Sequence, residues 1–208
     1  MTESESQPAG TIWMMDLDRP RPVVSPAIDA RFTRLSLDDL PALTIAMGED
    51  SIEEIRSRFE AGKWCFGAWI ANRLASFGWV SFEEEAVGEL RLRLSLLTGE
   101  AYIWNCVTLP VFRNYHLYSA LLAFIVGELF TIPYCRVWIG ADQENEASQR
   151  GIARAGFTHV ADMIIDRMLP IRQVWVKGLT GVPESLVAEA RRVFLNDRDK
   201  VGLTVLHR

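Results

Sequence analysis

Residues 101–157 read AYIWNCVTLPVFRNYHLYSALLAFIVGELFTIPYCRVWIGADQENEASQRGIARAGF, and this stretch decides the fold. It predicts an apolar strand, an apolar helix, a second apolar strand and a short helix, over about 101–108, 115–130, 135–141 and 146–155. The turn after the first strand carries Pro110 and Arg113. A strand that runs into a helix N-terminus is where α/β proteins bind phosphorylated ligands, because free backbone N–H groups and the helix dipole favour an anion.

The flanking sequence predicts further strands and helices. Alternating or apolar runs predict strands over about 30–35, 64–70, 73–82, 157–166 and 171–179. Helical patterns cover about 37–43, 51–61 and 184–197. The run LRLRLSL over 90–96 fits either an extra edge strand or a hairpin arm. The sequence therefore predicts an α/β fold of the α+β type, with a central mixed sheet and helices on both faces.

Three segments are expected along the chain. Residues 1–28 are rich in proline with little periodicity, which predicts a flexible or loosely docked arm. Trp13, Met14 and Met15 are an apolar cluster in this arm, which would dock on the main domain or on a second subunit. Residues 29–180 form the main domain, and residues 181–208 a C-terminal helical extension.

Composition excludes several classes of function. The net charge is −5 and the arginines are scattered along the sequence, so we expect no basic surface for nucleic acid or an anionic membrane. The three cysteines lie far apart in apolar runs without metal-ligand spacing, so we expect reduced thiols and no metal site. The N-terminus lacks a basic and an apolar region, and no apolar run is long enough to span a bilayer. We therefore expect a cytoplasmic protein.

The elements within 101–157, and the residues at their joints, resemble the acetyl-coenzyme A-binding core of the GNAT superfamily of N-acyltransferases. In that family a proline-type turn precedes the pattern Arg/Gln-x-x-Gly-x-Gly/Ala, which here begins at Arg113. The resemblance spans about residues 30–177 and implies acetyl-CoA, or another acyl-CoA, as co-substrate. Its pyrophosphate would lie on N–H groups at the helix start, and its pantetheine arm along the preceding strand edge. The implied cofactor-binding residues are Thr108, Leu109, Arg113, Asn114, His116, Leu117, Tyr118, Ser119 and Asn145.

The sequence departs from the family pattern at three places. His116 and Tyr118 occupy the two glycine positions, so their side chains must point away from the pyrophosphate. The family often has a tyrosine that protonates the departing thiolate four residues before the Gly-Phe pair, and Ile152 stands there. Asn145 matches the asparagine that bonds the pantetheine arm, and it also fits a simple helix N-cap. One side chain can serve both roles.

The sequence offers several candidates for the groups that carry out the chemistry. A backbone N–H near Thr108, where the two strands splay, is a candidate oxyanion donor. The candidate catalytic side chains are Glu100, Asn105 and Tyr102 on the strand, and the acidic run 83–85, which fits either a solvated loop or a contact for a cationic amine. Tryptophans on neighbouring strands are candidates for core packing or for an acceptor pocket: Trp64, Trp69, Trp79 and Trp104.

The resemblance implies an N-acyltransferase that moves an acetyl or related acyl group from acyl-CoA to a primary amine, by direct attack in a ternary complex. The altered residues His116, Tyr118 and Ile152 motivate an alternative, a catalytically weak or inactive scaffold that binds or regulates. A third hypothesis is transfer to a sugar amine or from an aminoacyl donor. The expected partner is a small-molecule amine, with no nucleic acid and no membrane, and a homodimer is possible.

Overall fold

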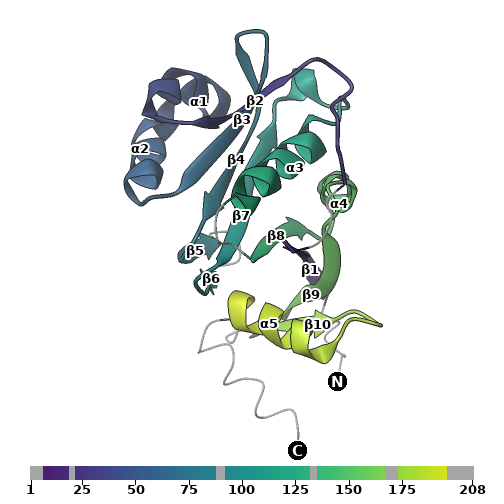
Figure 1. The fold of residues 1–208 in the computed structure, drawn as a ribbon. Coiled ribbons are helices and arrows are strands. Elements are labelled where there is room, and N and C mark those ends of the chain that lie inside the picture. The colour runs from purple at the N-terminus through teal and green to yellow at the C-terminus, as the bar shows by residue number, and fades with distance from the viewer. Residues whose placement is uncertain (1–6, 19–21, 88–91, 132–134, 167–172, 196–208) are drawn as a thin grey trace, which may run out of the picture.

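The computed structural model describes residues 7–18, 22–87, 92–131, 135–166 and 173–195. Within them an eight-stranded sheet runs through the molecule (Figure 1), in the order β10-β9-β1-β8-β7-β4-β3-β2. The strands are β1 Gln7–Asp16, β2 Arg31–Leu35, β3 Trp64–Ile70, β4 Arg73–Ser81, β7 Glu100–Thr108, β8 Arg136–Asp142, β9 Thr158–Asp166 and β10 Gln173–Gly178. Among these pairings β7 with β8 is parallel and the others are antiparallel, so the sheet is mixed as predicted.

Helices cover both faces of this sheet, which confirms the predicted fold class. They are α1 Leu40–Met47, α2 Ile52–Glu60, α3 Leu117–Phe130, α4 Glu146–Arg154 and α5 Glu184–Phe194. Side chains alternate along a strand, so Ile103 of β7 packs with α3 and α4 while Trp104 contacts the opposite face. That opposite face is covered by α1 and α2 at one end and by α5 at the other (Figure 1). None of the described helices is long and apolar enough to cross a membrane.

The predicted arm over residues 1–28 is wrong for residues 7–16, which form β1 in the interior of the sheet. β1 pairs with β8 on one edge and with β9 on the other. Ile12 and Met14 on this strand are 1% and 4% exposed, and Trp13 and Met15 are buried on the other face. The strand forms because two partners distant in the chain satisfy its backbone, a cause that local periodicity does not reveal. Residues 1–6 and 19–21 of the predicted arm lie outside the described residues.

The run over 90–96 is partly described and forms a hairpin arm. β5, Glu84–Val87, pairs with β6, Leu92–Ser95, as a separate two-stranded sheet. Residues 90 and 91 lie outside the described residues.

The predicted C-terminal helix is confirmed as α5, which packs on β9 and β10 through Val193 and Phe194. Residues 196–208 lie outside the described part of the chain. The division at residue 180 stays a prediction.

Candidate active site

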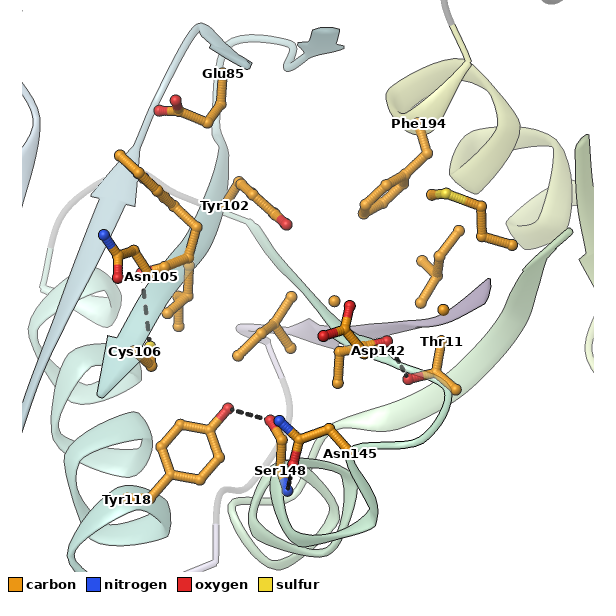
Figure 2. Close-up of a pocket in the computed structure, with 18 of the residues that line it drawn as sticks. Thr11, Glu85, Tyr102, Asn105, Cys106, Tyr118, Asp142, Asn145, Ser148 and Phe194 are labelled. Atoms are coloured by element: carbon orange, nitrogen blue, oxygen red, sulfur yellow. Dashed lines mark hydrogen bonds between the residues drawn. The ribbon is translucent and has the colours of Figure 1, made fainter. Parts of the chain in front are cut away.

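Strands β7 and β8 separate part way along, and a cavity of about 800 Å³ opens between them (Figure 2). Their parallel register runs from Glu100 opposite Arg136 to Ile103 opposite Ile139 and goes no further. The parts of β7 and β8 that follow Ile103 and Ile139 line the cavity. Gly10, Thr11 and Ile12 of β1 form another wall. The predicted splay of the two strands is therefore present, and β7 offers backbone groups there that β8 no longer pairs.

A bulge in β7 lies at the cavity wall. The register between β4 and β7 shifts opposite Gly78, and Asn105 has a left-handed φ of 43°. With its amide oxygen turned toward α2, Asn105 accepts hydrogen bonds from both terminal nitrogens of Arg58, at 2.8 and 2.9 Å. Arg58 also pairs with Glu54 one helical turn earlier. The guanidinium thus ties α2 to the bulge.

A second polar network lines the same end of the cavity. The Lys63 ammonium donates to Glu85 Oε2 at 2.6 Å, and the Ser81 hydroxyl donates to the same carboxylate oxygen. The Trp104 indole donates in turn to Ser81 Oγ at 2.9 Å. Glu85 is 5% exposed, whereas Glu83 and Glu84 are exposed to solvent. One carboxylate of the acidic run 83–85 therefore lines the cavity, and the other two form a solvated surface.

Tyr118 reaches from α3 across to α4. Its hydroxyl lies 3.1 Å from Ser148 Oγ, and both groups line the cavity (Figure 2). Gly151 makes room for the ring, because a Cβ there would lie 2.4 Å from a ring carbon. Burial raises the pKa of the Tyr118 hydroxyl, which therefore stays protonated at neutral pH. Ile152, one turn beyond Ser148, is fully buried in the core.

Asn145 begins α4 and faces the cavity (Figure 2). Its side-chain oxygen accepts the Ser148 backbone N–H at 3.0 Å, which confirms the N-cap. The amide nitrogen is left pointing away from the helix and can donate to a ligand. The pantetheine role stays a prediction that this geometry permits.

The predicted phosphate-binding turn lies beside the cavity without lining it. His116 precedes α3 with a left-handed φ of 59°, the conformation that suits the glycine of the family pattern. Its ring contacts Arg154 of α4. Ser119 is 2% exposed, and its hydroxyl donates to the His116 carbonyl at 3.0 Å. The first-turn N–H groups of α3 receive no side-chain cap from His116 and remain available to an anion.

The other proposed cofactor residues have partners within the protein. Arg113 Nε donates to the Thr108 carbonyl at 3.3 Å, and the Leu109 N–H donates to Ala75 at 2.9 Å. Leu117 is buried against β3 and β4, and Asn114 adopts a positive φ in the exposed turn. Only Tyr118 and Asn145 of the predicted cofactor set line the cavity.

Two of the three candidate catalytic residues line the cavity, and the third does not. Asn105 and Tyr102 line the cavity, with the Tyr102 hydroxyl near the Cβ position of Gly140. Glu100 is 4% exposed at the opposite end of β7, where it pairs with Arg192 and accepts the Leu97 N–H at 2.9 Å. Of the four tryptophans proposed for a pocket, Trp104 lines the cavity and Trp64, Trp69 and Trp79 pack in the sheet.

All three cysteines are free thiols, and the described residues hold no cluster suited to a metal ion. Burial raises the pKa of the Cys106 thiol to about 12, so this cavity residue is not a thiolate nucleophile at neutral pH. Its sulfur packs close to Gly78 of β4.

The exposed Cys135 is expected to react with iodoacetamide at pH 8 at least about 10-fold faster than Cys106, because burial keeps the Cys106 thiol protonated and only the thiolate is nucleophilic. Peptide mass spectrometry of the folded protein measures both rates, and labelling in denaturant supplies the control in which the thiols react alike. Rapid labelling of Cys106 in the folded protein would contradict its buried, protonated state.

Reasoning from the sequence missed the residues that α2 and β3 bring to the cavity. Arg58 reads as one charge on an amphipathic helix, and Lys63 as a charge in the turn after it. The only signal was the position of Arg58 on the Ile55 side of the helix, where a core-facing cation needs a partner. The sequence does not predict the wall that β1 supplies, because residues 7–16 lack the periodicity of a strand.

A mixed sheet with helices on both faces and a cavity where two parallel strands splay is the arrangement of the GNAT fold. The chain is similar to an acetyltransferase of the GNAT family from Colwellia psychrerythraea, with a TM-score of 0.55 and 17% identity over 83% of this chain. It is also similar to AAC(6')-Iy in complex with the bisubstrate analogue CoA-S-monomethyl-acetylneamine, with a TM-score of 0.50 and 17% identity. That match covers 63% of this chain and 92% of the other. The chain therefore has the GNAT fold.

The chain spans 57% of the length of the Colwellia acetyltransferase. No protein-family model matches the chain, and no curated protein matches it.

Proposed function

We propose that this protein is an N-acyltransferase that moves an acetyl or related acyl group from acyl-CoA to a primary amine. The observation that carries the proposal is the cavity at the β7–β8 splay, in a GNAT fold, bordered by a helix N-terminus with free N–H groups. The acyl-pantetheine arm would lie along the unpaired edge of β7 and contact the Asn145 amide. The pyrophosphate would lie at the start of α3, where N–H groups and the helix dipole favour an anion.

The residues that hold the reacting groups come from both ends of the cavity. A backbone N–H of β7 beyond Ile103 would donate to the thioester carbonyl oxygen, where negative charge develops in the transition state. The acceptor amine would enter from the α2 side, where Glu85 presents a buried carboxylate. Glu85 would take the proton that the amine loses, directly or through water.

Tyr118 would donate the proton that the departing thiolate needs. Its hydroxyl lies at the same face of α4 as position 152, because residues 148 and 152 are one helical turn apart. The new C–N bond forms as the C–S bond breaks, the thiolate takes the phenolic proton, and solvent returns a proton to Tyr118 by way of Ser148.

Release of free thiol from acetyl-CoA in the presence of primary amines tests the proposed activity. Purified protein should release coenzyme A in step with formation of an acylated amine, detected by mass spectrometry. Absence of both products across a broad amine panel and several acyl-CoA chain lengths would remove the proposal.

Tyr118→Phe is expected to lower kcat between about 10- and 100-fold while leaving the affinity for acetyl-CoA unchanged, because only the proton donor is lost. Ser148→Ala, which keeps the hydroxyl of Tyr118, serves as the matched control and should reduce kcat less. An unchanged kcat in Tyr118→Phe would exclude the phenol as the acid.

A second candidate function rests on the position of Tyr118. Its bulky ring lines the cavity at a position where the GNAT pattern has a glycine, whereas residues 114–117 do not line the cavity. A scaffold that no longer binds CoA tightly, and acts as a binding or regulatory module, would have such an obstruction. Under that alternative Tyr118→Gly raises the affinity for acetyl-CoA. Under the proposed enzyme the same change lowers it, because the side chain belongs to the site.

A further inference from the structure

The α2 end of the cavity places two cations on a single indole ring. The guanidinium carbon of Arg58 lies 4.4 Å from the Trp104 ring centroid, and the Lys63 ammonium lies 4.7 Å from it. Both side chains line the cavity, and both are largely withdrawn from solvent, at 9% and 20% side-chain exposure. Two cations held this close require negative charge nearby. Glu54 and Glu85 each supply one carboxylate.

The N–H donors of the two cations outnumber the acceptors that contact them among the described residues. The Lys63 ammonium has three N–H donors, and Glu85 is its one acceptor among the described residues. The Glu85 oxygen that accepts from Lys63 also accepts a hydrogen bond from the Ser81 hydroxyl. Lys63 therefore presents two further charged donors to the cavity.

Arg58 adds donors of the same kind. Two of its N–H groups bond the Asn105 oxygen, and one contacts Glu54. A guanidinium carries five N–H groups, so two remain without an acceptor among the described residues. A negatively charged group that only accepts hydrogen bonds would pair with the donors of both cations, whereas a neutral acceptor would form weaker hydrogen bonds with them.

From this donor excess we infer that the α2 end of the cavity is a subsite for an anionic group on the acceptor, formed by Lys63 and Arg58. The inference rests on the proposed N-acyltransferase function, which makes the ligand of this subsite an acyl acceptor. The acceptor class is then a primary amine that also carries a carboxylate or a phosphate. Its ammonium would face Glu85 while its anionic group faces Lys63, so each charge of the ligand meets an opposite charge on one wall.

Binding without acyl-CoA tests the subsite by itself. The probes are two matched pairs: leucine with 3-methylbutylamine, and phosphoethanolamine with ethanolamine. Within each pair only the anionic group differs, and the two pairs separate carboxylate from phosphate as its source. Calorimetric titration of the full chain should show at least one anionic member binding about 10-fold or more tightly than its neutral partner. Equal affinities within both pairs would overturn the inference.

Three variants separate the subsite from a structural role of Lys63. Lys63→Met should abolish the preference for the anionic probe, and Lys63→Arg should retain it. Glu85→Gln should increase the ratio of affinities between the anionic probe and its partner without the anionic group. Both members of a pair lose the ammonium contact with Glu85, but only the anionic member gains from a Lys63 that no longer pairs with a carboxylate. If Lys63 had a purely structural role, Lys63→Met and Glu85→Gln would not shift the preference for the anionic probe in opposite directions. Lys177→Met, an exposed lysine on β10, is the control and should change nothing.

Failure of the subsite and failure of the enzyme give different results. If Lys63→Met does not fold, as judged by circular dichroism, Lys63→Arg and Glu85→Gln still decide the outcome, because an unchanged affinity ratio within the probe pairs in Glu85→Gln counts against the subsite. Thiol release that is equal for neutral and anionic amines would overturn the subsite and leave the enzyme. Lys63-dependent binding of an anionic probe without any thiol release would overturn the enzyme and leave the subsite.

Discussion

Ile12→Asp is expected to unfold the protein or leave it barely folded. Ile12 is 1% exposed in the centre of β1, where it packs with Trp138 and Val160. The substitution removes a buried apolar side chain and places a carboxylate there without a partner. The two effects together cost about 5 kcal/mol or more, which approaches the whole stability of an ordinary domain.

The consequence is large because β1 joins two parts of the sheet. In the strand order β1 lies between β9 and β8, and the described residues show no direct pairing of β8 with β9. Strands β9 and β10 therefore join the hydrogen-bonded sheet through β1, whereas α5 also contacts β7 and β8 directly, through the ion pairs of Arg192 with Glu100 and of Glu189 with Arg136. Damage to this strand is expected to break the hydrogen-bonded link between β9 and the rest of the sheet, and also to remove a wall of the cavity.

Urea unfolding followed by circular dichroism measures the effect, and limited proteolysis locates it. Val23→Asp is the matched control, because Val23 is 95% exposed and the same substitution there should change stability by about 0.5 kcal/mol or less. An Ile12→Asp protein with the midpoint of the wild type would mean that residues 7–16 are not an interior strand.

Gly140→Leu is expected to weaken binding of acetyl-CoA strongly while leaving the fold intact. Gly140 lies on β8 just beyond the point where β7 and β8 separate. A Cβ at this position would lie 3.5 Å from the Thr11 carbonyl oxygen and 3.6 Å from the Tyr102 hydroxyl, which are ordinary contacts. A longer side chain must continue into the space between the strands. That space is where the acyl-pantetheine arm is proposed to lie.

The expected loss of affinity is about 100-fold or more, which corresponds to about 2.7 kcal/mol. Gly140→Ala is the matched control, since a methyl group fits the available contacts, and it should bind acetyl-CoA within about threefold of the wild type. Circular dichroism and thermal unfolding show whether each variant is folded. Tight binding of acetyl-CoA to a folded Gly140→Leu protein would place the acyl arm elsewhere.

The sequence predicted those elements whose signals are local. The strand and helix over 101–130 appear as β7 and α3 because an uninterrupted apolar run needs burial wherever it lies. Asn145 caps α4 as predicted because the cap uses a side chain and an N–H only three residues away. The hairpin turn at residues 71–73 follows from similarly short-range requirements, with a positive φ at Ala71.

The sequence failed where the cause is a distant partner. β1 contains Pro8 and Gly10, and its backbone is satisfied by strands 120 or more residues away. The cavity wall was missed for the same reason. Arg58 meets Asn105, and Lys63 meets Glu85, only after α2 and the β5–β6 hairpin have docked beside β7. Glu100 lies on β7, as predicted, but at the end of the strand away from the cavity. Its ion pair with Arg192 could not be predicted, because Arg192 is distant in the sequence.

Calorimetric titration of the purified chain with acetyl-CoA, beside free coenzyme A, tests the central claim most directly. If the splay between β7 and β8 holds an acyl-pantetheine arm, acetyl-CoA binds at micromolar concentration, about −8 kcal/mol, and more tightly than free coenzyme A. Absence of binding up to millimolar concentration would contradict the proposed acyl-CoA site and favour the scaffold alternative.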